Sequence, residues 1–191
     1  MHTSKLILIP SLALLTLLAA CGGSTGGNLA TTEVPAETQV TVVEFSDFNC
    51  PACAASYPVT REVRRLPNVH FEYRNFPLDI PGHETSFAAA NAFECGVAQG
   101  KAEEFEAALF ENSGTFTDEF LRELPSKYGF DIDLTAYETC VDEQQFTDKI
   151  LDDVRTASRT GLNSTPSFVV NGEVVRGARN LKEIVETKLA E

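Results

Sequence analysis

The stretch VTVVEFSDFNCPAC, residues 40–53, decides how this chain folds. Residues 40–45 are mostly β-branched or apolar, which predicts a buried strand. Pro51 suits the first turn of a helix, where its missing backbone N–H costs nothing. We expect that helix to run to about Leu66, because Pro67 and Asn68 then break it. The stretch therefore predicts a strand-to-helix junction with Cys50 and Cys53 at the start of the helix.

A cysteine pair with two residues between its members has two common chemistries. At a helix N-terminus the partial positive charge stabilises a thiolate, so Cys50 is expected to be nucleophilic and the inner Cys53 to be its resolving thiol. The alternative is zinc, which usually needs two further ligands. His70 and His83 are isolated and there is no second such cysteine pair. We therefore expect no metal ion and no cofactor.

The rest of the chain alternates between short β patterns and helical ones. Residues 69–74 alternate apolar and polar side chains, which predicts a half-buried strand with His70 on its solvent face. Asn171 and Gly172 predict a hairpin turn, and Gly129 predicts a helix stop. The other expected elements are a loop at 75–82, helices from about 84 to 159, strands at 166–170 and 173–176, and a helix at 181–189.

The first 20 residues predict a signal peptide. A weakly basic start at His2 and Lys5 precedes an uncharged apolar run, Leu6 to Ala20, too short for a comfortable membrane span. The run ends in Leu-Ala-Ala-Cys and resembles a bacterial lipobox, which predicts lipidation of Cys21. The alternative is ordinary secretory cleavage that leaves Cys21 as a free thiol. Residues 21–37 are rich in Gly, Ser and Thr and predict a flexible tether, so the folded domain is expected at 38–191.

The composition narrows the function. The formal net charge is −13 and no basic patch is present, which argues against nucleic-acid binding. Five cysteines are an odd number, and lipidation of one explains it. Of the remaining four, Cys50 and Cys53 are near enough to pair locally, leaving Cys95 with Cys140. We expect that second pair to be a structural disulfide worth roughly 4 kcal/mol. The alternatives are a second redox pair or two buried thiols.

Several motifs together resemble the DsbA-like thioredoxin family. Residues 44–53 resemble the active-site segment of that family. Asn75 to Leu78 with His83 resembles the loop that leads into its helical insertion, and residues 164–172 resemble the segment that carries its cis-proline. The resemblance runs from about residue 40 to 191. It implies an α/β, thioredoxin-like fold with an inserted helical domain, about 82–160, between the second and third core strands.

The resemblance also implies roles for three residues. Pro166 would be cis and face the cysteine pair, and the backbone of Thr165 would pair with an extended substrate. Without the resemblance, a trans proline at the start of a strand is the ordinary expectation. Glu44 would lie near the resolving cysteine and help to move its proton, whereas its alternative is a structural carboxylate at the end of a strand.

The function implied is a protein-disulfide oxidoreductase that makes disulfides in exported proteins through Cys50 and Cys53. Its expected partners are unfolded or reduced exported proteins and a membrane oxidase of the DsbB or VKOR type. Its expected location is the cell envelope, extracytoplasmic and lipid-anchored to a membrane, facing the periplasm in a cell with two membranes.

One departure from the family bears on the direction of electron flow. Many strongly oxidising members have His where this chain has Ala52. The side chain of Ala52 cannot donate to the Cys50 sulfur, which predicts a weaker oxidant. The rival is therefore a disulfide reductase or isomerase. A copper-binding assembly module is a further alternative, but its relatives space the cysteines by three and add a histidine.

Overall fold

The computed structural model describes residues 35–191 of the chain. The predicted signal peptide, the predicted lipidation site Cys21 and most of the predicted tether lie outside the described residues. Within residues 35–191, no helix has the length and apolar character needed to cross a membrane.

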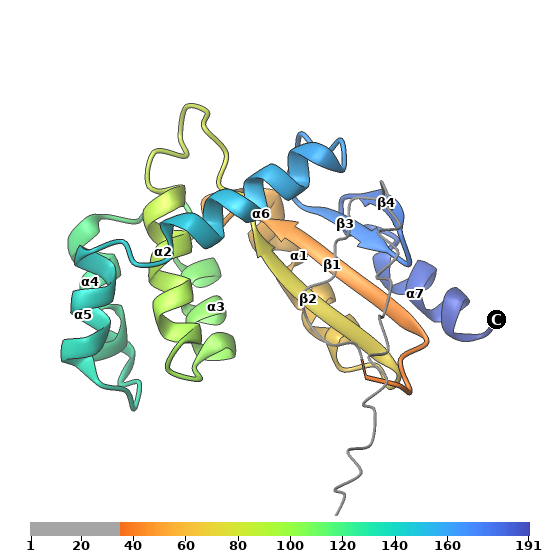
Figure 1. Cartoon of the computed structure of the whole chain (residues 1–191), viewed down its shortest axis with the longest axis horizontal. Helices are drawn as coiled ribbons and strands as arrows, with labels where there is room; N and C mark the ends of the chain where they lie inside the picture. Colours follow the sequence, from red (N-terminus) through yellow and green to blue (C-terminus); the bar gives the residue numbers. More distant parts are fainter. Residues whose placement is uncertain (1–34) are drawn as a thin grey trace, which may run out of the picture.

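The centre of the fold is a four-stranded mixed sheet in the order β2-β1-β3-β4 (Figure 1). β1 and β2 are parallel, and β3 is antiparallel to both of its neighbours, β1 and β4. The strands are β1 (Val40–Ser46), β2 (Val69–Asn75), β3 (Ser167–Val170) and β4 (Glu173–Arg176). β3 begins one residue later than predicted, because Pro166 has no N–H for the strand ladder.

Helices cover both faces of this sheet. α1 (Pro51–Arg64) connects the parallel strands and packs with α7 (Leu181–Leu189) against one face. α6 (Thr147–Arg159) crosses the opposite face (Figure 1). This arrangement, together with the sheet order, confirms the thioredoxin-like α/β fold.

A helical insertion separates β2 from β3. Among the described residues it begins with four helices beside the β2 edge of the sheet and ends with α6 (Figure 1). The four are α2 (Ser86–Val97), α3 (Ala102–Glu111), α4 (Asp118–Tyr128) and α5 (Leu134–Asp142). Gly129 ends α4 in the left-handed conformation, as predicted. At Gly96 a Cβ atom would overlap the Phe105 ring, so this glycine permits the close contact between α2 and α3.

The apolar core of the insertion is continuous with the cysteine pair. Its largest cluster of buried residues includes Phe48, Cys50 and Cys53 together with the aromatic and aliphatic side chains of α2 to α5. Phe48 packs its ring against Phe93 of α2 and Phe110 of α3, with centroids 5.2 and 4.8 Å apart. The segment before the cysteines is therefore buried by the insertion.

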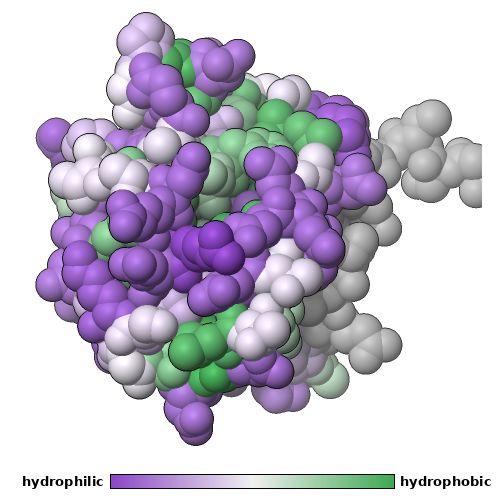
Figure 2. Space-filling model, turned by 90° about the vertical axis from the view of Figure 1, so that its left-hand side faces the viewer, coloured by the Kyte–Doolittle hydropathy of each residue, from purple (hydrophilic) through white to green (hydrophobic). Residues whose placement is uncertain are grey.

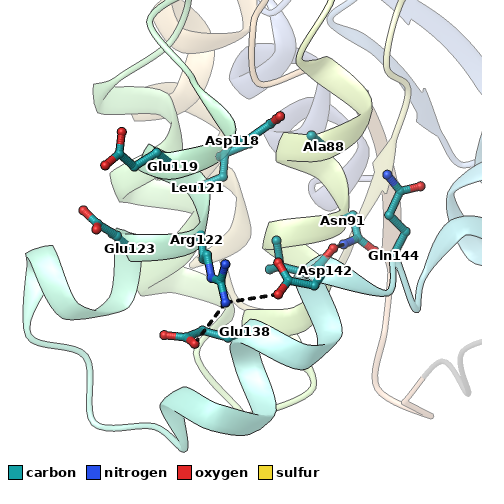
Figure 3. A pocket seen from close by; sticks show the side chains of 11 residues that line it. Ala88, Asn91, Asp118, Glu119, Leu121, Arg122, Glu123, Glu138, Asp142 and Gln144 are labelled. Atoms are coloured by element: carbon teal, nitrogen blue, oxygen red, sulfur yellow. Dashed lines mark hydrogen bonds and ion pairs between the residues drawn. The ribbon is translucent and has the colours of Figure 1, made fainter.

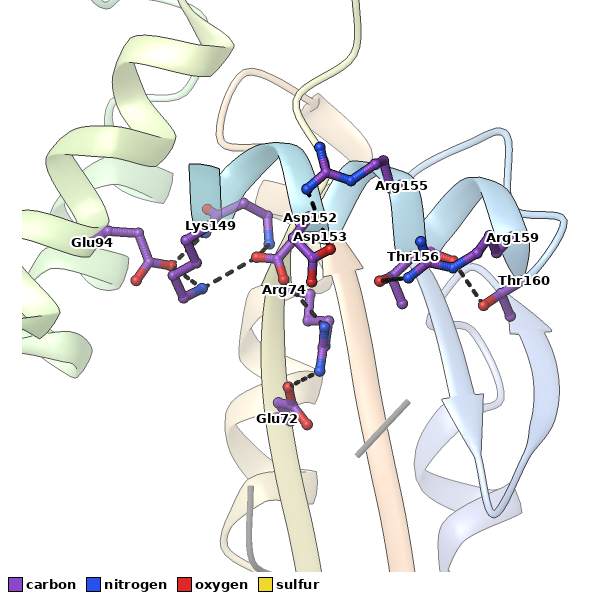
Figure 4. Close-up of polar contacts among 11 residues, drawn as sticks. Glu72, Arg74, Glu94, Lys149, Asp152, Asp153, Arg155, Thr156, Arg159 and Thr160 are labelled. Carbon is purple, nitrogen blue, oxygen red and sulfur yellow. Dashed lines mark hydrogen bonds and ion pairs between the residues drawn. The ribbon is translucent and has the colours of Figure 1, made fainter. Parts of the chain in front are cut away.

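The prediction that the polar face of β2 points to solvent is wrong. His70 and Glu72 are partly buried, and Arg74 is buried where α6 packs against β2. Arg74 forms ion pairs with Glu72 (2.7 Å) and with Asp153 of α6 (3.3 Å) (Figure 4).

The same polar network continues into α2. Lys149 of α6 contacts Glu94 of α2 at 2.7 Å and Asp153 at 3.2 Å (Figure 4). Asn75 donates its side-chain N–H to Glu94 and its backbone N–H to Asp153. These contacts join the insertion to the edge of the sheet.

Candidate active site

The cysteine pair lies at the start of α1. Cys50 is the residue before the helix and has extended backbone angles, and Pro51 is the first helical residue. Cys50 is 7% exposed and Cys53 is fully buried. Both are free thiols in the structure. The outer sulfur can therefore meet a partner while the inner one is shielded.

The two thiols differ strongly in acidity. The hydrogen bond from the Cys53 thiol is the main reason that the pKa of Cys50 falls to about 5, although burial opposes the shift. Thr165 and the backbone N–H groups of Cys53 and Ala52 lower the same pKa further. Burial, followed by the hydrogen bond to Cys50, raises the pKa of Cys53. At neutral pH the pair therefore combines an outer thiolate with an inner thiol.

Ala52 contributes through its backbone. Its methyl side chain donates nothing to the sulfur, as expected, but its N–H group at the helix N-terminus stabilises the Cys50 thiolate. The thiolate is consequently stabilised without a side-chain donor between the cysteines.

The predicted proline segment lies against Cys50. The Thr165–Pro166 peptide bond is cis. The carbonyl oxygen of Thr165 is 3.6 Å from the Cys50 sulfur, and the carbonyl of Pro166 accepts a hydrogen bond from Gly177. Cys50 and Thr165 thus lie side by side although they are 115 residues apart in the sequence.

Glu44 lies behind the pair on β1 and is 1% exposed. Burial is the main cause that raises its pKa to about 8, and the nearby Glu106 raises it further, whereas Arg64 and Ser46 lower it. Ser46 also lowers the pKa of Cys53, so its hydroxyl lies near both groups.

Tyr73 completes this polar cluster from the neighbouring strand. It pairs with Glu44 in the β1–β2 register, and burial followed by Glu44 raises its pKa. One carboxyl oxygen of Glu44 and the hydroxyls of Ser46 and Tyr73 have no hydrogen-bond partner among residues 35–191. Glu44, Ser46 and Tyr73 therefore form a polar site next to Cys53 in an otherwise apolar core.

Asp47 holds the loop before the cysteines, a role that sequence reasoning missed. Its buried carboxylate accepts hydrogen bonds from the backbone N–H of Asn49 (2.8 Å) and of Leu78 (2.9 Å) and from the Ser86 hydroxyl (2.6 Å). His83 contacts the same carboxylate through Nδ1 at 2.7 Å. The polar motif Ser46-Asp47-Phe48-Asn49 was a signal, but the distant partners were not predictable from it.

Asn49 connects the same loop to the insertion. Its side chain donates to the Thr85 hydroxyl (2.8 Å) and accepts from the backbone N–H of Gly114 (3.2 Å). The residue directly before Cys50 is therefore bound both to the start of α2 and to the loop between α3 and α4. The insertion thereby supports the position of Cys50.

Cys95 of α2 and Cys140 of α5 form a disulfide with a Cα–Cα distance of 5.9 Å. Both residues are buried. The side-chain amide of Asn91 donates to the Cys140 carbonyl, and Asn91 accepts a hydrogen bond from the backbone N–H of Phe146. The disulfide therefore joins two helices of the insertion.

A pocket with a volume of about 640 Å³ lies on the insertion. Side chains from α2, α4 and α5 line it (Figure 3), and five of the eleven lining residues are acidic. Arg122 pairs there with Glu138 (3.4 Å) and Asp142 (3.1 Å). The insertion end of the molecule is mostly hydrophilic, with smaller hydrophobic patches (Figure 2). No cysteine lines the pocket, so the thiol chemistry lies elsewhere.

Comparisons with known proteins agree with this geometry. A family model described as "Thioredoxin" matches residues 35–187. A thioredoxin-like oxidoreductase from Silicibacter pomeroyi DSS-3 is 31% identical with a TM-score of 0.68, covering 81% of this chain and 89% of that one. BdbD from Bacillus subtilis has a TM-score of 0.69 at 23% identity, covering 82% and 91% of the two chains.

A curated relative is a much longer protein. The Na(+)/H(+) antiporter NhaA 1 of Salinispora arenicola is 30% identical over 152 residues, which is 78% of this chain but 23% of the antiporter. The chain thus spans less than a quarter of the length of that relative.

Proposed function

The chain belongs to the thioredoxin family, as a protein-disulfide oxidoreductase of the DsbA-like kind, and we propose that it introduces disulfide bonds into exported proteins. The observation that carries this proposal is the position of Cys50 at the N-terminus of α1 and beside the Thr165 carbonyl, an environment that stabilises its thiolate. A stabilised thiolate favours the reduced pair, and a pair that favours its reduced form oxidises its substrates.

The proposed reaction moves two electrons from substrate thiols to the Cys50–Cys53 disulfide. A substrate thiolate attacks the Cys50 sulfur, the Cys50–Cys53 bond breaks, and Cys53 leaves and takes up a proton. A second substrate thiolate then attacks the substrate sulfur of the mixed disulfide. The substrate disulfide forms and Cys50 leaves as a thiolate, for which a pKa of about 5 suits it.

The remaining site residues have supporting roles in this proposal. The main chain of Thr165, held beside Cys50 by the Pro166 segment, pairs with an extended substrate strand. Glu44 supplies and takes back the proton of Cys53. The Cys95–Cys140 disulfide stabilises the insertion and takes no part in electron transfer, consistent with the burial of both of its cysteines.

The proposed location is the extracytoplasmic side of a membrane, with the domain anchored through a lipidated Cys21 and facing the periplasm where there are two membranes. The proposed partners are reduced exported proteins and a membrane oxidase of the DsbB or VKOR type, which restores the Cys50–Cys53 disulfide. Metabolic labelling with a radioactive fatty acid tests the anchor. Label in the wild type and none in Cys21→Ser is the expected result, and an unlabelled wild type contradicts it.

The absence of a side-chain donor at Ala52 favours a second candidate, a reductase or isomerase of the cell envelope. The reduction potential separates the two. Equilibration with glutathione buffers is expected to place Cys50–Cys53 nearer to about −120 mV, the value for strongly oxidising DsbA, than to about −270 mV, the value for thioredoxin. A potential at the thioredoxin end supports the reductase.

Oxidation of a reduced, unfolded protein tests the main proposal. The oxidised wild type is expected to generate native disulfides in the substrate, Cys50→Ser to be inactive, and the soluble Cys21→Ser variant to match the wild type. Activity that survives in Cys50→Ser overturns the assignment.

A further inference from the structure

We propose that the ion pair between Arg64 of α1 and Glu106 of α3 is a positioning pair that sets how readily Glu44 gives its proton to Cys53. The inference rests on the proposed function, because it concerns the proton that Cys53 needs when it leaves the disulfide. It assigns to the helical insertion a chemical role in the reaction of the core.

The ion pair is well defined in the structure. Arg64 Nη1 is 2.5 Å from Glu106 Oε2, and Nη2 is 2.8 Å from Oε1, so both arms of the guanidinium are engaged. The Glu106 side chain is 2% exposed and that of Arg64 is 23% exposed. The guanidinium also lies over the Phe71 ring, 4.8 Å from its centroid. A two-armed pair of this kind has little freedom to reorient.

Glu44 shares this buried region with the pair. The charged groups that act on it are Arg64 from α1 and Glu106 from α3, and the uncharged polar neighbours are Ser46 on its own strand and Tyr73 on β2. Cys53, on α1, is the titratable thiol of the same region. Two carboxyl groups thus face one guanidinium.

Because two carboxyl groups share one guanidinium, one of the two must hold a proton. Glu106 engages both arms of the Arg64 guanidinium, whereas one oxygen of Glu44 has no partner among the described residues. Two buried carboxylates with one cation cannot both ionise without cost. The proton therefore stays on Glu44, whose pKa, raised first by burial and then by Glu106, is about 8.

A carboxyl group that titrates near the working pH can both give and take a proton. When the substrate sulfur bonds to Cys50, the Cys50–Cys53 bond breaks and its electron pair goes to Cys53. Glu44 gives its proton to that sulfur and becomes a carboxylate. In the reverse step the Cys53 thiol returns the proton to Glu44 as its sulfur attacks the mixed disulfide.

Two substitutions are expected to shift the titration midpoint of Glu44 in opposite directions. Glu106→Gln removes a negative neighbour and frees Arg64, so the midpoint of Glu44 is expected to fall by about one pH unit or more. Arg64→Gln removes the only cation named above, so the midpoint is expected to rise. A pair that merely packed α1 against α3 would not produce opposite shifts.

The measurement is an infrared pH titration of the carboxyl band in the full-length reduced protein, with the Glu44 band assigned by its loss in Glu44→Gln. A second readout is the pH profile of the rate at which Cys53 resolves a mixed disulfide between Cys50 and a small thiol. The two midpoints are expected to move together. The matched control is Glu62→Gln, also on α1, which breaks an exposed 2.8 Å pair with Lys182 of α7 and is expected to leave both midpoints unchanged.

Unmoved midpoints, or shifts of the same sign in folded Glu106→Gln and Arg64→Gln, overturn the proposal. If Glu106→Gln does not fold, Arg64→Gln still tests the proposal, because Arg64 is partly exposed. A Glu44 midpoint that stays or falls in Arg64→Gln is then sufficient to overturn the proposal. The infrared titration needs no substrate. If the wild type oxidises dithiols but the midpoints do not move in the variants, only the role of the ion pair is contradicted. If the wild type is inactive, the proposed function itself is contradicted.

Discussion

Two arginines of this protein each contact carboxylates, in opposite surroundings. Arg64 and Glu106 are 23% and 2% exposed and join α1 to α3. Arg122 of α4 contacts Glu138 and Asp142 of α5, and all three are about half exposed on the rim of the acidic pocket (Figure 3). Water screens the second group and not the first. The same residue types therefore alter chemistry in one place and only surface charge in the other.

The exposed region depends on a covalent bond more than on its ion pairs. Cys140 lies on α5 between Glu138 and Asp142, and its disulfide to Cys95 closes a loop with a sequence separation of 45. Replacing both cysteines by alanine is expected to lower the free energy of unfolding by roughly 4 kcal/mol. Urea unfolding of the wild type and the double variant measures this. A loss below about 1 kcal/mol contradicts it.

The buried region is expected to respond strongly to loss of its cation. Arg64→Met leaves the Glu106 carboxylate buried without its partner, which is expected to cost about 3 kcal/mol of stability at pH 7. Urea unfolding of the wild type and Arg64→Met at pH 7 measures this, and a loss below about 1 kcal/mol contradicts it.

The acidity of Cys50 offers a third comparison, between a buried thiolate site and an ordinary thiol. Because the pKa of Cys50 is about 5, the rate at which iodoacetamide alkylates it is expected to rise about tenfold from pH 4 to pH 7 and then level off. An ordinary thiol continues to gain reactivity up to about pH 8.5. Mass spectrometry of the reduced protein follows the reaction, and a rate still rising above pH 7 rules out the assigned acidity.

The same pKa has a consequence for stability. Because folding lowers the pKa of Cys50, the stabilisation is fully present above the pKa of the unfolded thiol and is lost as the pH falls towards 5. The oxidised protein lacks this contribution, which makes it the control in pH-dependent unfolding.

The smallest effect on stability is expected at Arg122, in the exposed region. Arg122→Ala breaks both of its ion pairs but leaves no buried charge, so stability is expected to change by about 0.5 kcal/mol or less. Compared with Arg64→Met under the same conditions, this variant measures how much burial increases the stability lost when the arginine is removed. Similar losses in the two variants would remove the contrast between the regions.

Much of the fold was predictable because its signals are local. The 40–53 stretch predicts β1 and the start of α1, and Asn171 with Gly172 predicts the β3–β4 hairpin. These patterns depend on side-chain periodicity and on turn geometry within a few residues. The same locality explains the error at β2, since the helix that buries Arg74 lies more than 70 residues further along the chain.

The candidate site divides in the same way. Cys50 and Cys53 were identifiable from their spacing and their helix position, whereas Asp47 needed Leu78, His83 and Ser86, which only folding brings to it. No pattern around these residues specifies such partners.

The sequence by itself determined the strand-to-helix junction, the cysteine pair at its centre and the order of elements around it. The reason is that backbone preference and apolar periodicity act over short stretches. Tertiary structure alone decided how acidic each site group is. The pKa values of Cys50 and Glu44 depend on burial and on charges brought close through space, and for Glu44 the decisive partners are Arg64 and Glu106.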